Sequence, residues 1–384
     1  HQDSLAGQTD VFVSKFDSTG KLIWSTFFGG INYDLGVDIA SNRSGDLYVL
    51  CNTASKKDST QKYIHDSLRG SIDAMVIRMT EQGAVKWAKY FGGDSIDIAT
   101  SISLNDRNQI YLAGYTLSDD LPTDTVKSAQ HQISGDTDGF VMRIDTLGTL
   151  IWATYLGGSK AEEILDIDSD EYGDVYITGY SNSSDFPVEG SVIQDTLNKG
   201  QDIVALRLDS TGDIVWSTYF GGSGDEAGVG IAIDKNRAAF ITGYTRSLDM
   251  RIFGKDTLQE AYGGGRNDAF VLCINRLGKG RFSTYYGGAG NDSATSIDWY
   301  LRAVVIAGNT NTSFLHGTET GVQKKKRAGY DGFTLNLDSN ARFLGASYLG
   351  GNGIDFLSDA MFYYGGQAFT GHSQSTDFHT LDAN

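Results

Sequence analysis

The feature that most constrains the fold is a segment ending in two glycines that recurs six times. Leu22–Gly30 reads LIWSTFFGG, and Val85–Gly93 reads VKWAKYFGG. The first glycines of successive pairs lie 63, 65, 64, 66 and 63 residues apart, at Gly29, Gly92, Gly157, Gly221, Gly287 and Gly350. Six copies of a unit of about 64 residues therefore fill the 384-residue chain. A period of this length predicts one structural unit per copy, packed against its neighbours.

Each unit contains four short runs with strand character. Alternation of apolar and polar residues, β-branched and aromatic residues and glycine-centred turns indicate strands, and no segment keeps a 3.6-residue apolar period. In the unit after Gly30 the strands are expected at 34–41, 46–51, 73–79 and 84–91, with a long polar loop at 52–72. Four antiparallel strands per repeat with a short link to the next repeat are typical of a β-propeller blade.

The predicted fold is therefore all-β: a single six-bladed β-propeller domain over residues 1–384, made of four-stranded antiparallel blades. The blades are expected near 31–93, 94–158, 159–222, 223–288 and 289–351, with a sixth formed from 352–384 plus 1–30. In this split blade the C-terminal segment supplies two inner strands (355–361 and 366–371) and the N-terminal segment two outer strands (10–16 and 21–28). Such a blade closes the ring and leaves no open sheet edge between the termini.

Composition limits the classes of function. The formal net charge of −17 and the pI near 4.6 argue against a nucleic acid or an anionic membrane surface as partner, because both require a basic face. Cys51 and Cys273 occupy non-equivalent positions in different units, so neither a disulfide framework nor a thiolate metal site is expected. No run of about 18 apolar residues is present, so no membrane insertion is expected. The composition suits a secreted, acidic protein.

Three residue types recur at fixed places in the unit. One position in the fourth strand holds a large aromatic residue in five copies, which we interpret as blade-to-blade packing in preference to ligand stacking: Trp24, Trp87, Trp152, Trp216 and Phe282, with Gly345 in the last copy. The glycine pairs allow positive φ or close backbone approach. An aspartate opens each third strand and is expected to cap amides of the preceding loop: Asp10, Asp73, Asp138, Asp202, Asp268 and Asp331.

A second set of acids follows each glycine pair by four residues: Asp34, Asp97, Glu162, Glu226, Asp292 and Asp355. Turn capping is the simpler interpretation, and cation or water binding at the mouth of a central channel is the alternative. A separate candidate is the calcium-loop-like segment 166–174, whose ligands would be Asp166, Asp168, Asp170 and Asp174. It lacks the twelfth-position acid and flanking helices of an EF-hand, so a solvated β-turn is the alternative. Calcium is the only cofactor considered.

The strand and turn motifs resemble a known family. An Asp-Ser-Thr-Gly turn followed by a Trp-Ser-Thr-Tyr-Phe-Gly-Gly strand occurs over 209–222, and Tyr176–Pro187 reads YITGYSNSSDFP. Together they resemble the SBBP β-propeller repeats of bacterial secreted and cell-surface proteins, in all six units. The resemblance implies a bacterial extracellular or cell-surface location and no settled catalytic residues. Asp17–Trp24 is also similar to the turn-and-Trp motif of quinoprotein propellers, whose repeats are shorter and lack the Gly-Gly ending.

Function is expected in the long loops between second and third strands, near 52–72, 115–137, 180–201, 244–267 and 309–330 and in the split sixth copy. The strands repeat while these loops differ, so the loops can supply one specific surface. Candidate ligand-binding residues are Tyr115, Tyr180 and Tyr244, which could stack on sugars or pack at the loop base, and the basic run Lys324, Lys325, Lys326 and Arg327, which is otherwise a solvated loop.

We therefore expect a monomeric domain that acts as a binding or adhesion module for a glycan or protein partner. Other domains of the same parent protein are further candidate partners. The alternatives are a structural spacer within a larger surface protein and a polysaccharide-active glycosidase or lyase. No nucleophile can be paired with a base and no Gly-x-Ser-x-Gly elbow is present, so no catalytic residue is assigned and an enzyme is not expected.

Overall fold

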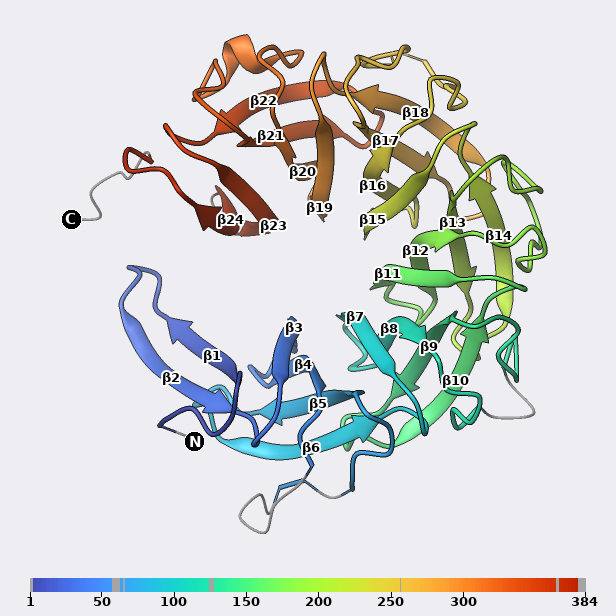
Figure 1. The fold of residues 1–384 in the computed structure, drawn as a ribbon, viewed down its shortest axis with the longest axis vertical. Coiled ribbons are helices and arrows are strands. Elements are labelled where there is room, and N and C mark those ends of the chain that lie inside the picture. Colours follow the sequence, from blue (N-terminus) through green and yellow to red (C-terminus); the bar gives the residue numbers. More distant parts are fainter. Residues whose placement is uncertain are drawn as a thin grey trace. The chain divides into compact units, whose positions relative to one another are not determined.

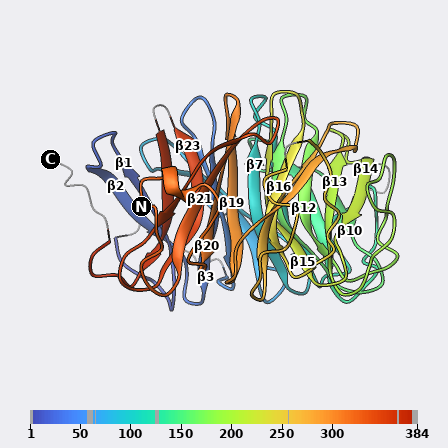
Figure 2. The ribbon, with the colours of Figure 1, turned by 90° about the horizontal axis from the view of Figure 1, so that it is seen from above.

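The computed structural model describes residues 3–56, 63–64, 66–123, 128–255, 257–363 and 366–378. Within these residues the chain forms 24 strands, β1 to β24, and one 3-10 turn, η1 (Thr318–Thr320). All neighbouring strand pairs with a recorded register are antiparallel (Figures 1 and 2). The prediction of an all-β chain with almost no helix is confirmed.

Five sheets contain four strands each, in chain order, and every first strand begins at the acid that follows a glycine pair. They are β3 (Asp34–Ser41), β4 (Leu47–Thr53), β5 (Asp73–Met79) and β6 (Val85–Phe91); β7 (Asp97–Leu104), β8 (Ile110–Thr116), β9 (Asp138–Ile144) and β10 (Leu150–Leu156); β11 (Glu162–Ser169), β12 (Val175–Ser181), β13 (Asp202–Leu208) and β14 (Ile214–Phe220); β15 (Glu226–Ile233), β16 (Ala239–Thr245), β17 (Asp268–Ile274) and β18 (Gly280–Tyr286); and β19 (Asp292–Tyr300), β20 (Ala303–Thr310), β21 (Asp331–Asp338) and β22 (Phe343–Leu349).

The chain ends form two further sheets of two strands each. One pairs β1 (Val11–Phe16) with β2 (Leu22–Phe28), and the other pairs β23 (Asp355–Tyr363) with β24 (Gly366–Ser373). Six four-stranded sheets were predicted, whereas the described residues form five, with the two halves of the sixth as separate sheets. A local turn or loop joins the neighbouring strands within every sheet, whereas β24 and β1 come from opposite ends of the chain and belong to separate sheets.

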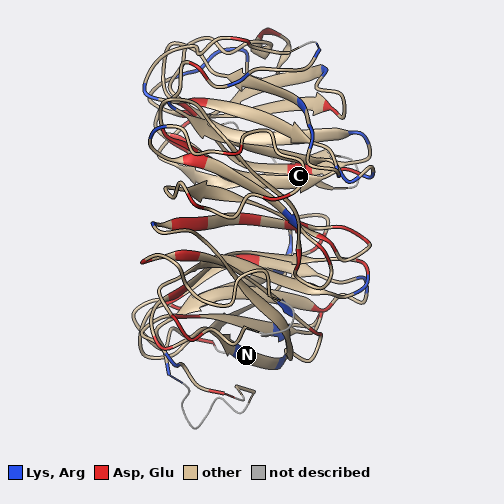
Figure 3. Ribbon diagram, turned by 90° about the vertical axis from the view of Figure 1, so that its right-hand side faces the viewer, with Lys and Arg blue, Asp and Glu red and all other residues tan. Residues whose placement is uncertain are grey.

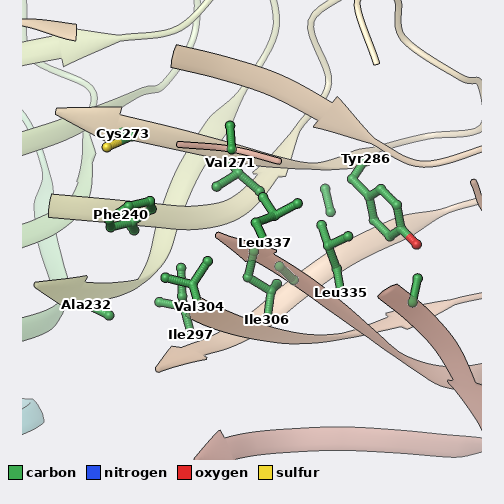
Figure 4. Close-up of a cluster of buried hydrophobic side chains, with 14 of the residues drawn as sticks. Ala232, Phe240, Val271, Cys273, Tyr286, Ile297, Val304, Ile306, Leu335 and Leu337 are labelled. Atoms are coloured by element: carbon green, nitrogen blue, oxygen red, sulfur yellow. The ribbon is translucent and has the colours of Figure 1, made fainter. Parts of the chain in front are cut away.

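The chain divides into two compact units, the first comprising 1–175, 183–187 and 208–214, and the second 176–182, 188–207 and 215–384. Each unit contains its own buried apolar clusters. In the first unit, Leu112, Phe140 and Met142 belong to a buried cluster whose residues come from strands β4 to β10. In the second, Phe240, Val271 and Leu335 belong to a cluster drawn from β15 to β22 (Figure 4). Cys51 and Cys273 are both buried free thiols, so the prediction of no disulfide framework is confirmed for them.

The recurrent tryptophans join one repeat to the next. The Trp87 indole N–H donates to the Thr146 carbonyl at 3.0 Å, and Arg78 donates to the same carbonyl at 2.6 Å. The turn glycine beneath Trp87 is Gly148, which adopts φ of 70° and whose Cβ, if present, would lie 3.1 Å from the ring. The same Trp and Arg pair recurs with Trp152 and Arg143 on Ser210, and with Trp216 and Arg207 on Arg276. The interpretation of the tryptophans as blade-to-blade packing is confirmed.

Candidate functional site

The third-strand aspartates hold the bases of the long loops. Asp138 accepts hydrogen bonds from the backbone N–H groups of Ser134 and Gly135 at 2.9 and 3.1 Å. Asp331 does the same for Arg327 at 3.0 Å. These bonds confirm the predicted capping role, because each carboxylate satisfies loop amides that would otherwise lack a partner. The corresponding bonds in other repeats are those of Arg69 to Asp73, Asn198 to Asp202 and Gly263 to Asp268.

A glutamine strengthens four of these loop bases. The Gln130 side-chain amide donates to Asp138 at 2.8 Å, and its carbonyl oxygen accepts the N–H of Gly157 at 2.9 Å. It therefore ties the loop to both the third strand and the glycine pair. The same arrangement recurs at Gln194, Gln259 and Gln323. Sequence reasoning missed these glutamines, although each stands eight or nine residues before the third-strand aspartate.

The acids that follow the glycine pairs are buried and bonded. Glu226 accepts the N–H of Gly222 at 2.7 Å and the hydroxyls of Thr245 and Ser247 at 2.9 and 2.6 Å. Gly30, Gly93, Gly158, Gly288 and Gly351 make the equivalent backbone bond to their own acids. These buried side chains and their bonds to the glycine amides confirm the turn-capping interpretation, whereas cation or water binding by the same acids stays a prediction.

The two acid families explain why the glycine pairs are glycine. A Cβ on Gly221 would lie 2.5 Å from Asp202 Oδ1 and 2.6 Å from Glu226 Oε2. A Cβ on Gly222 would lie 2.6 Å from the Ser247 Cβ. None of the paired glycines is among the residues with positive φ. Close approach of the backbone, and not a left-handed conformation, is therefore the property that requires glycine.

Burial of these carboxyls changes their acidity. The pKa of Asp268 is raised to about 7, first by burial and also by the nearby Asp292 carboxylate, against the opposing effect of the hydrogen bond from the Gly263 amide. The pKa values of Asp73 and Asp202 are raised to about 6 for the same reason, burial first. A buried carboxyl facing a second carboxyl favours its neutral form. Because the carboxyls bond to glycine and loop amides in every copy, their primary role is structural.

The three candidate tyrosines lie at the second-to-last positions of strands β8, β12 and β16. They are therefore strand residues, although the sequence predicted them at the start of the long loops. All three are half-buried, and the Arg246 guanidinium stacks 5.6 Å from the Tyr244 ring centre. The equivalent position in the first repeat is Asn52, whose amide bonds to both the N–H and the carbonyl of Ala99 on the next first strand. Placement of Tyr115, Tyr180 and Tyr244 thus favours packing at the loop base, and sugar stacking stays a prediction.

The basic run lies on the loop between β20 and β21. Lys324 and Lys325 are exposed, whereas the Lys326 ammonium donates to the Gly329 carbonyl at 2.9 Å. The Arg327 guanidinium pairs with Asp377 at 3.0 Å. Acidic residues occur on strands as well as loops of this chain (Figure 3), so a run of four cations is locally distinctive.

The calcium candidates are distributed over β11 and the turn after it. Asp170 Oδ1 accepts the N–H groups of Tyr172 and Asp174 at 2.9 and 3.1 Å, the same turn geometry that Asp234 and Asp209 form in other repeats. Asp166 and Asp168 accept the N–H of the residue that follows each. Within the described ranges, no group of three or more His, Cys, Asp or Glu could hold a metal ion. Calcium binding stays a prediction.

The repeated sheets, turn caps and glycine pairs set the context for comparison with known proteins. A family model described as "SBBP: Beta-propeller repeat" matches residues 151–187 and 215–248, which contain Trp152 and Trp216. These two segments are SBBP β-propeller repeats. The matched SBBP segments run from a fourth strand into the second strand of the next repeat, the region that contains the glycine pair and its acid.

Two curated proteins share low identity with this chain. Regulatory protein FlaEY of Caulobacter vibrioides is 23% identical over 356 residues, covering 88% of this chain and 34% of that protein. The uncharacterized WD repeat-containing protein L264 of Acanthamoeba polyphaga mimivirus is 21% identical over 369 residues, covering 78% of this chain and 25% of that protein. The chain thus spans about a third and a quarter of the lengths of these relatives.

Solved structures with similar chains are remote. A protein of unknown function from Bacteroides caccae gives a TM-score of 0.39 at 8% identity, with 89% of this chain and 91% of that chain covered. One from Dyadobacter fermentans gives 0.41 at 12%, with 88% and 96% covered. The extracellular domain of the putative one-component system BT4673 from B. thetaiotaomicron gives 0.24 at 11%, with 96% and 55% covered. In the described part of the chain, no helix has the length and hydropathy needed to span a membrane.

Proposed function

We propose that this chain is a secreted or cell-surface β-propeller that binds a glycan or protein partner through the face formed by its long loops. The observation that carries the proposal is the contrast between loop base and loop. Aspartate and glutamine side chains hold the bases in the same way in successive repeats, whereas the loops themselves differ in sequence. Variable loops on a rigid scaffold are where recognition residues are found. The acidic composition and the SBBP resemblance support the extracellular location.

The proposal includes closure of the domain as a six-bladed ring. In the four-stranded sheets with a recorded register, the second and third strands pair so that Thr116 faces Asp138 and Thr310 faces Asp331. Carried over to the chain ends, this register pairs β24 with β1, with Ser373 opposite Asp10 and Gln367 opposite Phe16. The two-stranded sheets would then become one four-stranded blade without a free edge between them.

Within the loop face, the basic run is the part that we expect to recognise negative charge. Replacing Lys324, Lys325, Lys326 and Arg327 by Ser should weaken binding to an acidic glycan and reduce its salt dependence. Exposed charges contribute little to stability, so the melting temperature should stay within about 1–2 °C. A suitable screen is an array of neutral and acidic oligosaccharides, followed by titration of the best ligand at two ionic strengths.

A matched control removes the same amount of charge at the other strand ends. Lys21, Arg43, Lys235 and Lys279 are exposed on the short turns, at the opposite ends of the strands from the long loops. Their replacement by Ser should leave both affinity and salt slope close to those of the unaltered chain. Equal losses in the two variants would instead indicate a nonspecific charge effect, and binding mapped to the short-turn face would contradict the proposal.

The second candidate is a spacer role inside a longer surface protein. It is favoured by the lengths of the two curated relatives, since the chain covers only 34% and 25% of them. A spacer predicts no ligand on the array and no loss of function when the loop sequences are exchanged between repeats. We propose no catalytic role.

A further inference from the structure

One backbone amide in the glycine-pair loop is capped by a carboxylate in four repeats. The residue after the second glycine donates its N–H to an aspartate in the loop that follows the second strand. This aspartate lies four residues after the last residue of that strand. Ser159 donates to Asp185 at 2.9 Å, and Ser223 donates to Asp249 at 2.8 Å. The other two pairs are Asp94 to Asp120 at 2.9 Å and Asn352 to Asp377 at 2.7 Å.

This amide prefers an ionised carboxylate. The backbone N–H of Ser159 is the largest cause that lowers the pKa of Asp185, and the Ser223 N–H is the largest for Asp249. The serine hydroxyls add bonds of 3.0 and 2.9 Å to the same two carboxylates. Hydrogen bonding to the charged form stabilises it, so the loop provides a small carboxylate-binding position in each of these repeats.

The fifth repeat lacks the carboxylate. Phe314 stands where the siblings have aspartate, and Ala289 stands where two of them have serine. Phe314 is 69% exposed. Within the described part of the chain, the Ala289 N–H donates no hydrogen bond. The first repeat has Lys57 at this position, which lies outside the described residues.

The loop nevertheless keeps its shape on both sides of Ala289. The Gly288 N–H donates to Asp292 at 2.8 Å, and the Gly290 N–H donates to Thr312 at 2.8 Å, as the equivalent residues do in the sibling repeats. The Ala289 amide is therefore held in the position from which its siblings bind a carboxylate. Beside it lies a pocket of about 480 Å³, which falls within the usual range for a small-ligand site.

The lining of this pocket suits an acidic sugar. None of its residues carries a carboxylate, despite the strongly acidic composition of the chain. Phe314 offers an exposed aromatic ring, and Asn311, Thr312 and Ser313 offer polar groups. His316 completes the edge and packs against the Phe343 ring at 5.6 Å between ring centres. A ligand that joins a flat, partly apolar ring to a carboxylate matches both the exposed ring and the amide.

We propose that the fifth-repeat pocket binds a uronate residue of an acidic glycan, with the ligand carboxylate in the place of the missing aspartate and the sugar ring against Phe314. This inference rests on the proposed glycan-binding function and names one of its ligands. A peptide with acidic side chains has the carboxylate but no pyranose ring for Phe314 to cover.

The decisive variant is Phe314→Asp, which restores the internal cap of the sibling repeats. It should fold at least as well as the unaltered chain and lose at least about tenfold in affinity for α-1,4-linked trigalacturonate, because the aspartate occupies the amide and repels the ligand. Phe314→Ala should lose several-fold and Phe314→Tyr should retain binding. Leu248→Ala is the control, since Leu248 is 75% exposed on the equivalent loop of the fourth repeat. The amide resonance of Ala289 in a ¹⁵N-labelled sample should shift on titration with trigalacturonate.

The possible outcomes are distinct. Absence of trigalacturonate binding at millimolar concentration, or equal affinity in the Phe314→Asp variant, would overturn the inference. Equal binding of maltotriose would remove the carboxylate from the argument, and stronger binding of poly-L-glutamate would identify a peptide site in its place. If an array ligand loses affinity in the Lys324–Arg327 variant but not in Phe314→Asp, the loop-face function stands and the uronate pocket fails.

Discussion

The sheet β7 to β10 and the sheet β1 to β2 have related sequences but different burial. Phe140 on β9 is fully buried, whereas Phe12, at the same position on β1, is 69% exposed. Four residues further along these strands, Ile144 on β9 is fully buried, whereas the equivalent Phe16 on β1 is 57% exposed. The residues are equally apolar, so the difference comes from the missing neighbour strands. The terminal strand carries core residues for a sheet that its own two strands cannot complete.

The C-terminal sheet of β23 and β24 also leaves an apolar position exposed that is buried in the complete repeats. Phe378 follows β24 at the position of Met250 and Leu315, which are buried, yet its own side chain is 38% exposed. In the complete repeats the fourth-strand tyrosine secures this segment, since the Tyr285 hydroxyl accepts the N–H of Met250 at 2.9 Å. The sixth repeat would receive its fourth strand only from β2. Both terminal sheets therefore expose apolar positions that a shared blade would cover.

The largest expected effect separates the two sheets directly. Phe140→Ala should lower the free energy of unfolding by about 3–5 kcal/mol, because it leaves a cavity in a fully buried site. If β1 pairs with β24 as proposed, Phe12→Ala should lower it by an amount approaching that range. Chemical denaturation of both variants measures the two values. A Phe12→Ala change of less than about 0.5 kcal/mol would match an exposed residue and contradict closure.

The sequence carried most of the fold and part of the site. Periodicity located the strands within one or two residues, since β3 and β5 begin and end where predicted. The proposed pairing of β1 with β24 would join the two chain ends, and local sequence patterns do not determine such long-range pairings. The Ala289 pocket was missed because it depends on a substitution in one repeat, Phe314 for aspartate, and on which amide that aspartate would cap. Only a comparison of all six copies together with the backbone bonds reveals it.

An intermediate effect concerns buried charge in a complete sheet. The pKa of Asp268 is raised by burial to about 7, above its ordinary value near 4. Between these two pH values, the folded state keeps a proton on Asp268 that the unfolded state has released. The associated stability is present below about pH 4 and is lost as the pH rises towards 7 and beyond. Asp268→Asn should therefore raise stability at pH 8 relative to pH 5, by about 1–3 kcal/mol, and flatten the pH dependence of the melting temperature.

The measurement is thermal unfolding of the Asp268→Asn variant and of the unaltered chain across this pH range. No flattening in Asp268→Asn would contradict the paired-carboxyl account itself.

The smallest expected effect is a gain at the two positions where the repeat-to-repeat contact is missing. In repeats that keep the tryptophan, it covers the turn glycine of the next repeat, as Trp87 covers Gly148 and Trp216 covers Gly278. Gly345 replaces the tryptophan on β22, and a Cβ there would have no neighbour within 4 Å; the same is true of Gly20 in the turn between β1 and β2. If the ends close as proposed, these two vacancies face each other. Gly345→Trp should then place an indole over Gly20, donate to the Ser18 carbonyl and stabilise the chain by about 1–2 kcal/mol.

Gly345→Ala separates the effect of removing a glycine from a strand, which is at most about 1 kcal/mol, from the effect of the ring. A melting temperature that rises with Trp beyond the Ala value supports closure, and Gly20→Ala combined with Gly345→Trp should reduce that gain. Equal melting temperatures for Trp and Ala at position 345 would show that nothing covers the ring and that the terminal sheets stay apart.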